Sequence, residues 1–203
     1  MTLTPTIVLG LGEAGCRMAA AVDERVGEEG DGEYVKILGV DSRPDDPSRT
    51  LPDGASSLVL EGEEALWAEE RERASYLTSD HELPALGGAA RQRPVGRFLV
   101  DTPEALERTW RFLERETERF VTELEQTVSG PSASELDVWI LNSLAGGTGS
   151  GAFPLIAGLF DEVLAELEAD RQVETTLRGA GSVLRLDRLD EQVRRPEHPP
   201  AHY

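Results

Sequence analysis

The stretch Ala145-Gly146-Gly147-Thr148-Gly149-Ser150-Gly151 decides how this sequence folds. It follows an apolar run, Leu136 to Leu141, that is typical of a buried strand, and it precedes a helical pattern that starts at Ala152. A glycine-rich turn between a strand and a helix leaves backbone N–H groups pointing outward at the positive end of the helix dipole. Glycine permits close approach of phosphate oxygens, and the hydroxyls of Thr148 and Ser150 add donors. The stretch therefore predicts a phosphate cradle.

Length and cysteine content bound the class of protein. At 203 residues the chain is long enough for one domain with a full core. Cys16 is the only cysteine, so no intrachain disulfide is possible, which fits a reducing cytoplasm. No apolar run reaches the length of a membrane span, and we expect a cytoplasmic protein without membrane insertion.

The acidic excess is the second large signal in the composition. The net charge is −19, with 39 acidic residues against 20 basic ones, and Lys36 is the only lysine. This balance resembles that of proteins from salt-accumulating archaea, where molar salt shortens the Debye length to about 3 Å and screens self-repulsion. We therefore expect a halophilic archaeal protein, the alternative being an ordinary acidic protein. Either origin disfavours binding to nucleic acid.

Strand patterns alternate with helix patterns along most of the chain. Strands are predicted at Thr6–Leu9, Tyr34–Val40, Leu58–Leu60 and Leu136–Leu141. Helices are predicted at Gly12–Val26, at Gly62–Tyr76, from a cap at Asp101 or Thr102 to about Gly130, and at Phe153–Leu167. Loops are expected at Gly27–Gly32, Ser42–Asp53 and Leu83–Arg97. This alternation predicts an α/β fold, a three-layer Rossmann-like parallel sheet with helices on both faces.

The pattern decays after Asp170. Val173 to Leu186 could form one strand, but Arg178, Gly179 and Gly181 are expected to interrupt it. The end of the chain from Glu191 is polar and proline-rich, and we expect it to be disordered. We therefore divide the chain into a nucleotide-binding domain at residues 1–170 and a degenerate strand with a polar tail at residues 171–203.

A second glycine loop, Gly10-Leu11-Gly12-Glu13-Ala14-Gly15, follows the first strand and opens a helix. Alone, this GxGxxG pattern suits a Rossmann module that binds NAD or FAD with Asp41 on the ribose, although Asp41 lies further on than the usual ~20 residues. Two such loops at the carboxyl edge of one parallel sheet can instead hold a triphosphate from two sides. Neither loop matches GxxxxGK[ST], which excludes a Walker-type P-loop.

Taken in order, these loops resemble those of the tubulin/FtsZ superfamily, over roughly residues 6 to 168. Ala145–Gly151 is similar to the family's GGGTG[ST]G signature, and Ala152–Ala157 resembles the AxPxIA that follows it in FtsZ. Gly12–Gly15 is similar to the first nucleotide loop, GQ[CAG]G, with Glu13 where glutamine is frequent.

Two further loops carry the same resemblance. Asp41 lies where the family's second loop would begin. Gly87-Gly88, followed by Arg93-Pro94-Val95-Gly96-Arg97, resembles the loop over the terminal phosphate in prokaryotic tubulin-like proteins.

The resemblance implies a truncated tubulin/FtsZ nucleotide-binding domain that binds GTP or GDP, with Mg²⁺ accompanying the nucleotide. The implied nucleotide-binding residues are Gly12, Glu13, Ala14, Gly15, Asp41, Gly88, Ala145, Gly146, Gly147, Thr148, Gly149 and Ser150. Residues 146–149 would hold phosphates, and Gly88 would face the terminal one. A valine at Gly147 is expected to take the place of a phosphate oxygen.

The resemblance also implies self-assembly in a cytoskeletal or cell-division role, with another copy of the chain or a full-length relative as partner. In the family, the helix that lies against the base and the acidic catalytic loop come later than Tyr203, where this sequence stops. Catalytic residues therefore stay unknown, and GTP hydrolysis by this chain alone is expected to be very slow. We expect a half-domain, a trimmed product or a frameshifted product whose tail is mobile from about residue 190. A degenerate, non-enzymatic filament regulator is a further alternative.

Other chemistry-bearing residues point to no separate site. His81, His198 and His202 are not spaced with acids or Cys16 as metal ligands, so no protein metal site is expected. Cys16, at the start of a helix, could have a lowered thiol pKa, but a small buried residue beside the loop is favoured. The tryptophans Trp67, Trp110 and Trp139 fit core positions better than a base-stacking platform.

Overall fold

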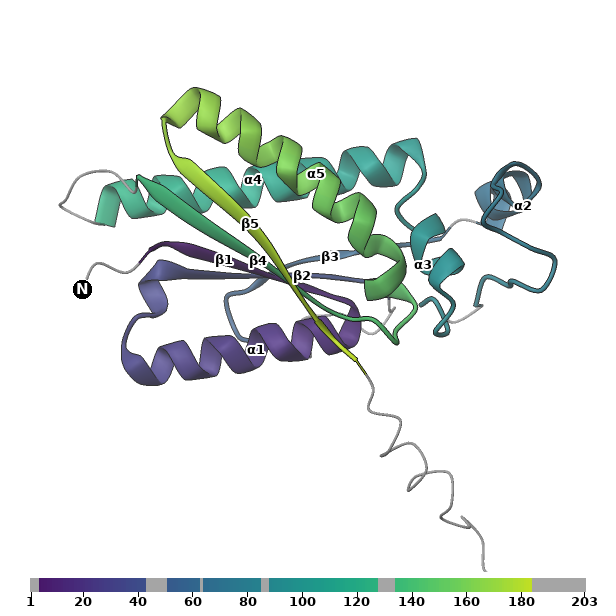
Figure 1. The fold of residues 1–203 in the computed structure, drawn as a ribbon, viewed down its shortest axis with the longest axis horizontal. Coiled ribbons are helices and arrows are strands. Elements are labelled where there is room, and N and C mark those ends of the chain that lie inside the picture. The colour runs from purple at the N-terminus through teal and green to yellow at the C-terminus, as the bar shows by residue number, and fades with distance from the viewer. Residues whose placement is uncertain (1–3, 43–50, 63, 85–87, 128–133, 184–203) are drawn as a thin grey trace, which may run out of the picture.

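A parallel β-sheet organises the part of the chain that the computed structural model describes, residues 4–42, 51–62, 64–84, 88–127 and 134–183. Within it, five strands lie side by side in the order β3-β2-β1-β4-β5 (Figure 1). Their bounds are β1 Thr6–Leu11, β2 Val35–Asp41, β3 Ser56–Val59, β4 Glu135–Ser143 and β5 Glu174–Ser182. Every pairing is parallel, so all strands end at the same edge.

Helices cover both faces of this sheet, which confirms the predicted three-layer α/β fold. Helix α1 (Gly12–Glu29) lies on one face, and α4 (Pro103–Thr127) and α5 (Thr148–Arg171) lie together on the other (Figure 1). The short helices α2 (Glu64–Arg73) and α3 (Arg93–Phe98) lie beyond the carboxyl ends of the strands, and a 3₁₀ turn, η1 (Gly32–Tyr34), leads into β2.

Strand β1 lies at the centre of the sheet and divides the core. Ile7, Leu9 and Leu11 belong to the large cluster under α4 and α5, whereas Val8 packs with Cys16 on the α1 side. Successive side chains of a strand point to opposite faces, so a central strand with helices on both sides reads as one continuous apolar run. This explains why β1 and β4 were recognisable from the sequence.

Several expected boundaries are wrong, among them the helix expected at Gly62–Tyr76, which is α2 and ends at Arg73. Helix α1 continues to Glu29, through part of the expected loop, and ends where Gly30 adopts a left-handed φ of 84°. The expected loop at Leu83–Arg97 contains the start of α3, which has Pro94 in its first turn, a position that proline suits because its missing N–H has no helical acceptor there. Helix α5 begins at Thr148 rather than at Ala152, so residues 148–151 of the glycine-rich stretch are already helical.

Strand β5 also differs from the expectation, because it continues through Arg178, Gly179 and Gly181. It pairs with β4 over its whole length, from Glu174 opposite Glu135 to Ser182 opposite Ser143. At Gly179 an added Cβ would lie 3.3 Å from the Phe153 ring of α5, so glycine lets that helix approach the sheet. Arg178 Nη1 donates to Asp137 at 2.9 Å across to β4. The expected disordered tail from Glu191 lies outside the described residues.

Candidate functional site

The glycine loops meet at the carboxyl edge of the sheet. Strands β1, β2 and β4 are neighbours, with Leu11 opposite both Val40 and Asn142 in the register. The chain therefore leaves β1 at Gly12, β2 at Ser42 and β4 at Leu144 within one small region. In open parallel sheets this edge, beyond the ends of the central strands, is where ligands bind.

The first loop and the start of α5 are in direct backbone contact. Gly12 has a left-handed φ of 67°, and a Cβ added to it would lie 3.0 Å from the backbone nitrogen of Gly149. A Cβ added to Gly149 would lie 2.4 Å from the carbonyl oxygen of Leu11. Both glycines are buried. The two glycine loops therefore face each other, as expected. At Gly12 and Gly149 the space between the loops is filled by the backbones of the loops themselves.

The other positions of the first loop divide between packing and surface. A Cβ on Gly15 would lie 2.2 Å from the carbonyl oxygen of Leu141, so this glycine lets α1 pack on β4. The Glu13 carboxylate pairs with Arg17 one turn later, at 2.6 Å. Ala14 is exposed in the first turn of α1. The residues Gly12–Gly15 thus lie at the carboxyl edge of the sheet, as predicted, but they do not all point toward a single ligand site.

A hydrogen-bonded chain joins three loops that are far apart in the sequence. The Ser42 N–H donates to Asp41 Oδ1 at 2.8 Å, and the Gly88 N–H donates to the Ser42 carbonyl oxygen at 2.6 Å. The Ser42 and Thr148 hydroxyl oxygens are 2.5 Å apart. Asp41, Ser42 and Thr148 are 4%, 3% and 9% exposed, so the chain of bonds is shielded from water. The structure therefore brings Asp41, Gly88 and Thr148 together.

Ser42 is the residue that sequence reasoning missed. It links the end of β2 both to Gly88 and to Thr148, yet from the sequence it was taken only as the first residue of the loop Ser42–Asp53. Its position directly after the last residue of β2 was the available signal, because polar side chains at strand ends line the ligand edge of a parallel sheet.

Gly147 and Ser150 have neighbours that differ from the expected ones. A Cβ on Gly147 would lie 2.8 Å from Ala89 Cβ and 2.9 Å from the backbone nitrogen of Gln92. A side chain here would first meet the segment before α3, so the structure gives Gly147 a packing role, and its contact with a phosphate stays a prediction. The Ser150 hydroxyl, in the first turn of α5, donates to the carbonyl oxygen of Gly146, which precedes the helix.

Gly146 and Gly88 are the open positions of these loops. The nearest atom to a Cβ added at Gly146 is the Ser143 carbonyl oxygen at 3.6 Å, and at Gly88, whose φ is 82°, nothing lies within 4 Å. The loop at Ala145 is held by Ser143, which accepts the Ala145 N–H at its hydroxyl and the Gly146 N–H at its carbonyl, each at 3.3 Å.

The first turn of α5 supplies the polar groups that an anion needs. The first intrahelical bond of this turn runs from the Gly151 N–H to the Gly147 carbonyl at 2.9 Å. The N–H groups of residues 148–150 precede it, so they have no acceptor within the helix. These donors and the positive end of the dipole favour an anion at this end of the helix.

Helix α3 supports the same turn from the other side. A Cβ on Gly96 would lie 2.1 Å from the Gly147 carbonyl oxygen, and one on Gly151 would lie 2.2 Å from the Arg93 carbonyl oxygen. The Arg93 guanidinium donates to the carbonyl oxygen of Leu144. The RPxGR-like segment is therefore packed on the cradle.

Cys16 is a buried packing residue, as favoured from the sequence. Burial raises the pKa of its thiol to about 12, and the nearby Asp41 carboxylate adds to the increase. Its sulfur is 3.6 Å from the Gly10 carbonyl oxygen, to which the thiol donates. Trp67, which packs edge-on against Phe98 at 4.9 Å, is likewise in the core, and Trp110 and Trp139 pack at its margins.

Among the described residues there is neither a group of potential metal ligands nor a membrane-spanning helix. In that part of the chain, no three His, Cys, Asp or Glu side chains are grouped so as to hold a metal ion. The described His81 accepts the Thr78 N–H at Nδ1, at 2.9 Å, while His198 and His202 lie outside the described residues. Among the helices that are described, none is both long and apolar enough to cross a bilayer.

Comparison with known families covers the part of the chain that holds Gly88, α3 and the glycine-rich stretch. A family model described as tubulin-like matches residues 65–178, more than half of the chain. The chain belongs to this tubulin-like family. The matched span includes α3, α4, β4, the glycine-rich stretch and α5, and the family predicted from the loops is thereby confirmed.

Ten chains of solved structures match. One is CetZ2 from Haloferax volcanii, described as a GTPγS-bound protofilament, at 19% sequence identity and a TM-score of 0.42. The match covers 86% of this chain and 39% of that one, so this chain spans well under half the length of that structure. No curated protein matches.

Proposed function

We propose that this chain binds a guanine nucleotide, GTP or GDP, through its phosphates at the carboxyl edge of β1, β2 and β4. The observation that carries the proposal is the meeting of Gly12, Ser42, Gly88 and Thr148 around the first turn of α5. Membership of the tubulin-like family supports guanine as the base.

The residues present fit a phosphate group. The N–H groups at the start of α5 provide donors, and Gly146 and Gly88 leave space where a Cβ would otherwise stand. The Thr148 hydroxyl is bonded to Ser42 and would exchange that partner for a phosphate oxygen. Gly12 and Gly15 act differently, since they hold the first loop close to α5 and β4.

The net charge of −19 opposes an anionic ligand, so local charges matter. Glu13 at the edge is paired with Arg17, which reduces its repulsion of a phosphate. Mg²⁺ bound with the nucleotide would supply partial neutralisation of the phosphates. The chain's own contribution is the helix dipole and the oriented backbone donors.

We also propose that the chain alone hydrolyses GTP very slowly. The carboxylates identified at the cradle are engaged within the protein: Asp41 accepts the Ser42 N–H, and Glu13 pairs with Arg17. Neither is presented as a general base for an attacking water. Assembly with another copy or with a longer tubulin-like chain would supply the catalytic acidic residue. We place this assembly in the cytoplasm, in a cytoskeletal or cell-division role.

Burial of Asp41 argues against the alternative of an NAD- or FAD-binding module. Such a module would need a carboxylate at the end of β2 to face the ribose. Asp41 is only 4% exposed, and its Oδ1 accepts the N–H of the next residue. We therefore do not favour a dinucleotide.

Calorimetric titration with GTP, ATP and NAD in high-salt buffer tests the proposal. We expect GTP to bind most tightly and Gly146→Val to weaken GTP binding by at least ~2 kcal/mol, because the branched side chain fills the open position. Gly158→Val is the matched control, since Gly158 lies on exposed α5 surface with nothing within 4 Å. Equal GTP affinity of a folded Gly146→Val variant would exclude this loop as the site.

The acidic composition further supports a halophilic, archaeal origin. With a net charge of −19, self-repulsion should loosen the fold at low ionic strength. We expect the melting temperature to rise steadily from ~0.1 M to ~2 M KCl as the charges are screened. Scanning calorimetry at a series of salt concentrations measures this, and a flat or falling curve would leave an ordinary acidic protein.

A further inference from the structure

Arg93, the first residue of α3, lies beside the proposed phosphate site and has no carboxylate partner in the described part of the chain. Its guanidinium donates to the carbonyl oxygen of Leu144, directly before the glycine-rich stretch. We propose that Arg93 determines specificity at this site: when a nucleoside triphosphate binds, the guanidinium exchanges the Leu144 carbonyl for the terminal phosphate and so favours a triphosphate over a diphosphate. This inference rests on the proposed function.

The two ends of Arg93 lie at the two ends of the glycine-rich stretch. Its main chain touches the first turn of α5, since a Cβ added to Gly151 would lie 2.2 Å from the Arg93 carbonyl oxygen. Its guanidinium contacts Leu144, which precedes Ala145 and the open position Gly146. The side chain therefore runs along the stretch that is proposed to hold the phosphates, and its charged end lies near the open part of that stretch.

The segment that carries Arg93 is held in place by backbone hydrogen bonds on both sides of this residue. Before it, the Gly88 N–H donates to the Ser42 carbonyl at 2.6 Å and the Gln92 N–H donates to the Ala89 carbonyl at 2.7 Å. After it, the Gly96 N–H donates to the Gln92 carbonyl at 3.0 Å. Only the side chain of Arg93 needs to move for the exchange, and such preorganisation lowers the entropy cost of binding.

The same segment favours the terminal phosphate over the inner ones. It begins at Gly88, which is expected to face the terminal phosphate, whereas the backbone donors of residues 148–150 at the start of α5 are available to the inner phosphates. A diphosphate leaves the position next to Gly88 without an anion. Arg93 therefore gains a charged partner only when the third phosphate is present.

The present partner of Arg93 is easily replaced. The Leu144 carbonyl is neutral, Leu144 is 43% exposed, and the Arg93 side chain is exposed as well. A hydrogen bond of this kind in contact with water contributes little net stability. A phosphate accepts two parallel N–H bonds from the planar guanidinium, and such charge-assisted bonds are about twice as strong as neutral ones.

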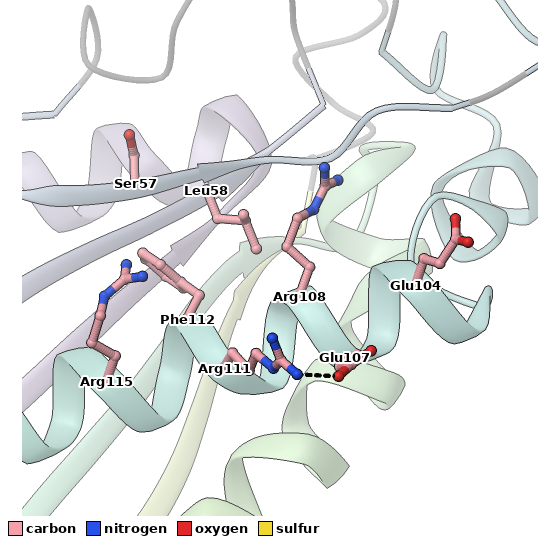
Figure 2. A pocket seen from close by; sticks show the side chains of 8 residues that line it. All are labelled: Ser57, Leu58, Glu104, Glu107, Arg108, Arg111, Phe112 and Arg115. Carbon is pink, nitrogen blue, oxygen red and sulfur yellow. Dashed lines mark hydrogen bonds and ion pairs between the residues drawn. The ribbon is translucent and has the colours of Figure 1, made fainter.

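Other arginines near the ends of the strands are already neutralised. Arg97, one turn later in α3, pairs with Asp101 at 3.0 Å and lies over the Tyr76 ring. Arg17 pairs with Glu13 at 2.6 Å. The arginines of α4 beside β3 also have carboxylate partners, and Figure 2 shows the pair of Arg111 with Glu107; the three pairs join Arg108 to Glu61, Arg111 to Glu107 and Arg115 to Glu116.

A purely structural role for Arg93 makes a different prediction. If its only task were to fasten Leu144 to α3, its loss would destabilise the free protein and weaken the binding of triphosphate and diphosphate alike. A role in specificity changes the ratio of the two affinities. The ratio is therefore the quantity to measure.

The test is calorimetric titration of the full chain with GTPγS and with GDP, both with Mg²⁺ in high-salt buffer. We expect Arg93→Gln to lower the affinity for GTPγS about tenfold and that for GDP less than about twofold, because the amide keeps a donor but loses the charge. Arg93→Lys keeps the charge without the fork and should lose only about threefold for GTPγS, which also serves as the comparison if Arg93→Gln does not fold.

Arg91→Gln is the matched control, because Arg91 is exposed on the same segment and the charge change is identical. It should leave the ratio of affinities unchanged. An equal loss for both nucleotides in Arg93→Gln, or an unchanged ratio, overturns the role of Arg93. The same change of ratio in Arg91→Gln overturns it too, since the effect would then come from the general field of the segment.

Titration with inorganic tripolyphosphate and pyrophosphate separates this inference from the proposed function, because neither probe carries a base. If GTP binds no more tightly than ATP while Arg93→Gln abolishes a preference for tripolyphosphate, the guanine proposal fails and the role of Arg93 stands. If the parent binds GTPγS and GDP and the variant keeps their ratio, the role of Arg93 fails and the proposed function stands. A parent protein that binds none of these ligands overturns both.

Discussion

The glycines of the stretch Ala145–Gly151 and of the loop at Gly88 look alike in the sequence, but in the structure they fall into two groups with different surroundings. Gly147, Gly149 and Gly151 press against other segments, with an added Cβ 2.8, 2.4 and 2.2 Å from its nearest atom. Gly146 and Gly88 face open space, the first with 3.6 Å to its nearest atom and the second with nothing within 4 Å. Glycine is required both where backbones touch and where a ligand approaches, and only three-dimensional position separates the two causes. The following variants test that separation.

The largest effect is expected at Gly151. A Cβ there would lie 2.2 Å from the Arg93 carbonyl oxygen and 2.7 Å from the Arg97 backbone nitrogen, so α3 would have to move. We expect Gly151→Ala to lower the free energy of unfolding by about 3 kcal/mol, measured by urea denaturation. Gly158→Ala on the same helix is the control, because its open position should make the change neutral or stabilising by up to ~1 kcal/mol. Similar unfolding curves for both variants would mean that α3 does not pack closely on α5.

A smaller effect is expected at Gly147, which the comparison assigns to packing. Gly147→Ala would bring a methyl group 2.8 Å from Ala89 Cβ, and we expect a loss of about 2 kcal/mol in the free energy of unfolding without nucleotide. Gly146→Ala should change that free energy by no more than ~0.5 kcal/mol. If the two variants lose equal stability, the division between packed and open glycines fails within one loop.

The smallest effect concerns the bond that joins the loops. Thr148→Val removes one hydroxyl of the Ser42–Thr148 pair and leaves the other buried without a partner, which should cost about 1–2 kcal/mol. Thr109→Val is the matched control, since Thr109 is fully buried and its hydroxyl has no partner within the described residues. It should be neutral or stabilising.

A double-mutant cycle with Ser42→Ala then isolates the pair. We expect a coupling of about 1 kcal/mol between the two hydroxyls, because each single variant leaves the other hydroxyl unpaired. Strictly additive losses would show that the two hydroxyls contribute independently and that the loop after β2 and the start of α5 are not linked through them.

Much of the architecture could be predicted because its signals are local. The apolar runs of β1 and β4 and the helical spacing in α4 mark elements that are buried on definite faces. The N-terminal cap of α4 was predicted as Asp101 or Thr102, and the structure shows the Thr102 hydroxyl accepting the Ala105 N–H at 3.3 Å. The continuous strand β5 could not be predicted, since the contact of Gly179 with Phe153 of α5 and the pairing with β4 join segments that are distant in the sequence.

The candidate site was predictable in its location and only partly in its roles. Glycine patterns after strands placed Gly12 and Gly146 at one edge of a parallel sheet, because parallel strands end together. The part played by Ser42 was missed, since its two partners, Gly88 and Thr148, are distant in the sequence. The packing of Gly147 was missed for the same reason: nothing near it in the chain indicates the segment that begins at Ala89.

By itself the sequence determined the α/β class, the strand–glycine–helix order, the family and the excess of negative charge, because hydrophobic periodicity, turn residues and composition are properties of short segments or of the whole chain. Only the tertiary structure decided which glycines touch other backbones, that Ser42 closes the loops around Thr148, and that three arginines of α4 lie along an edge strand. These are contacts between segments tens of residues apart, and their distances depend on how the helices pack on the sheet.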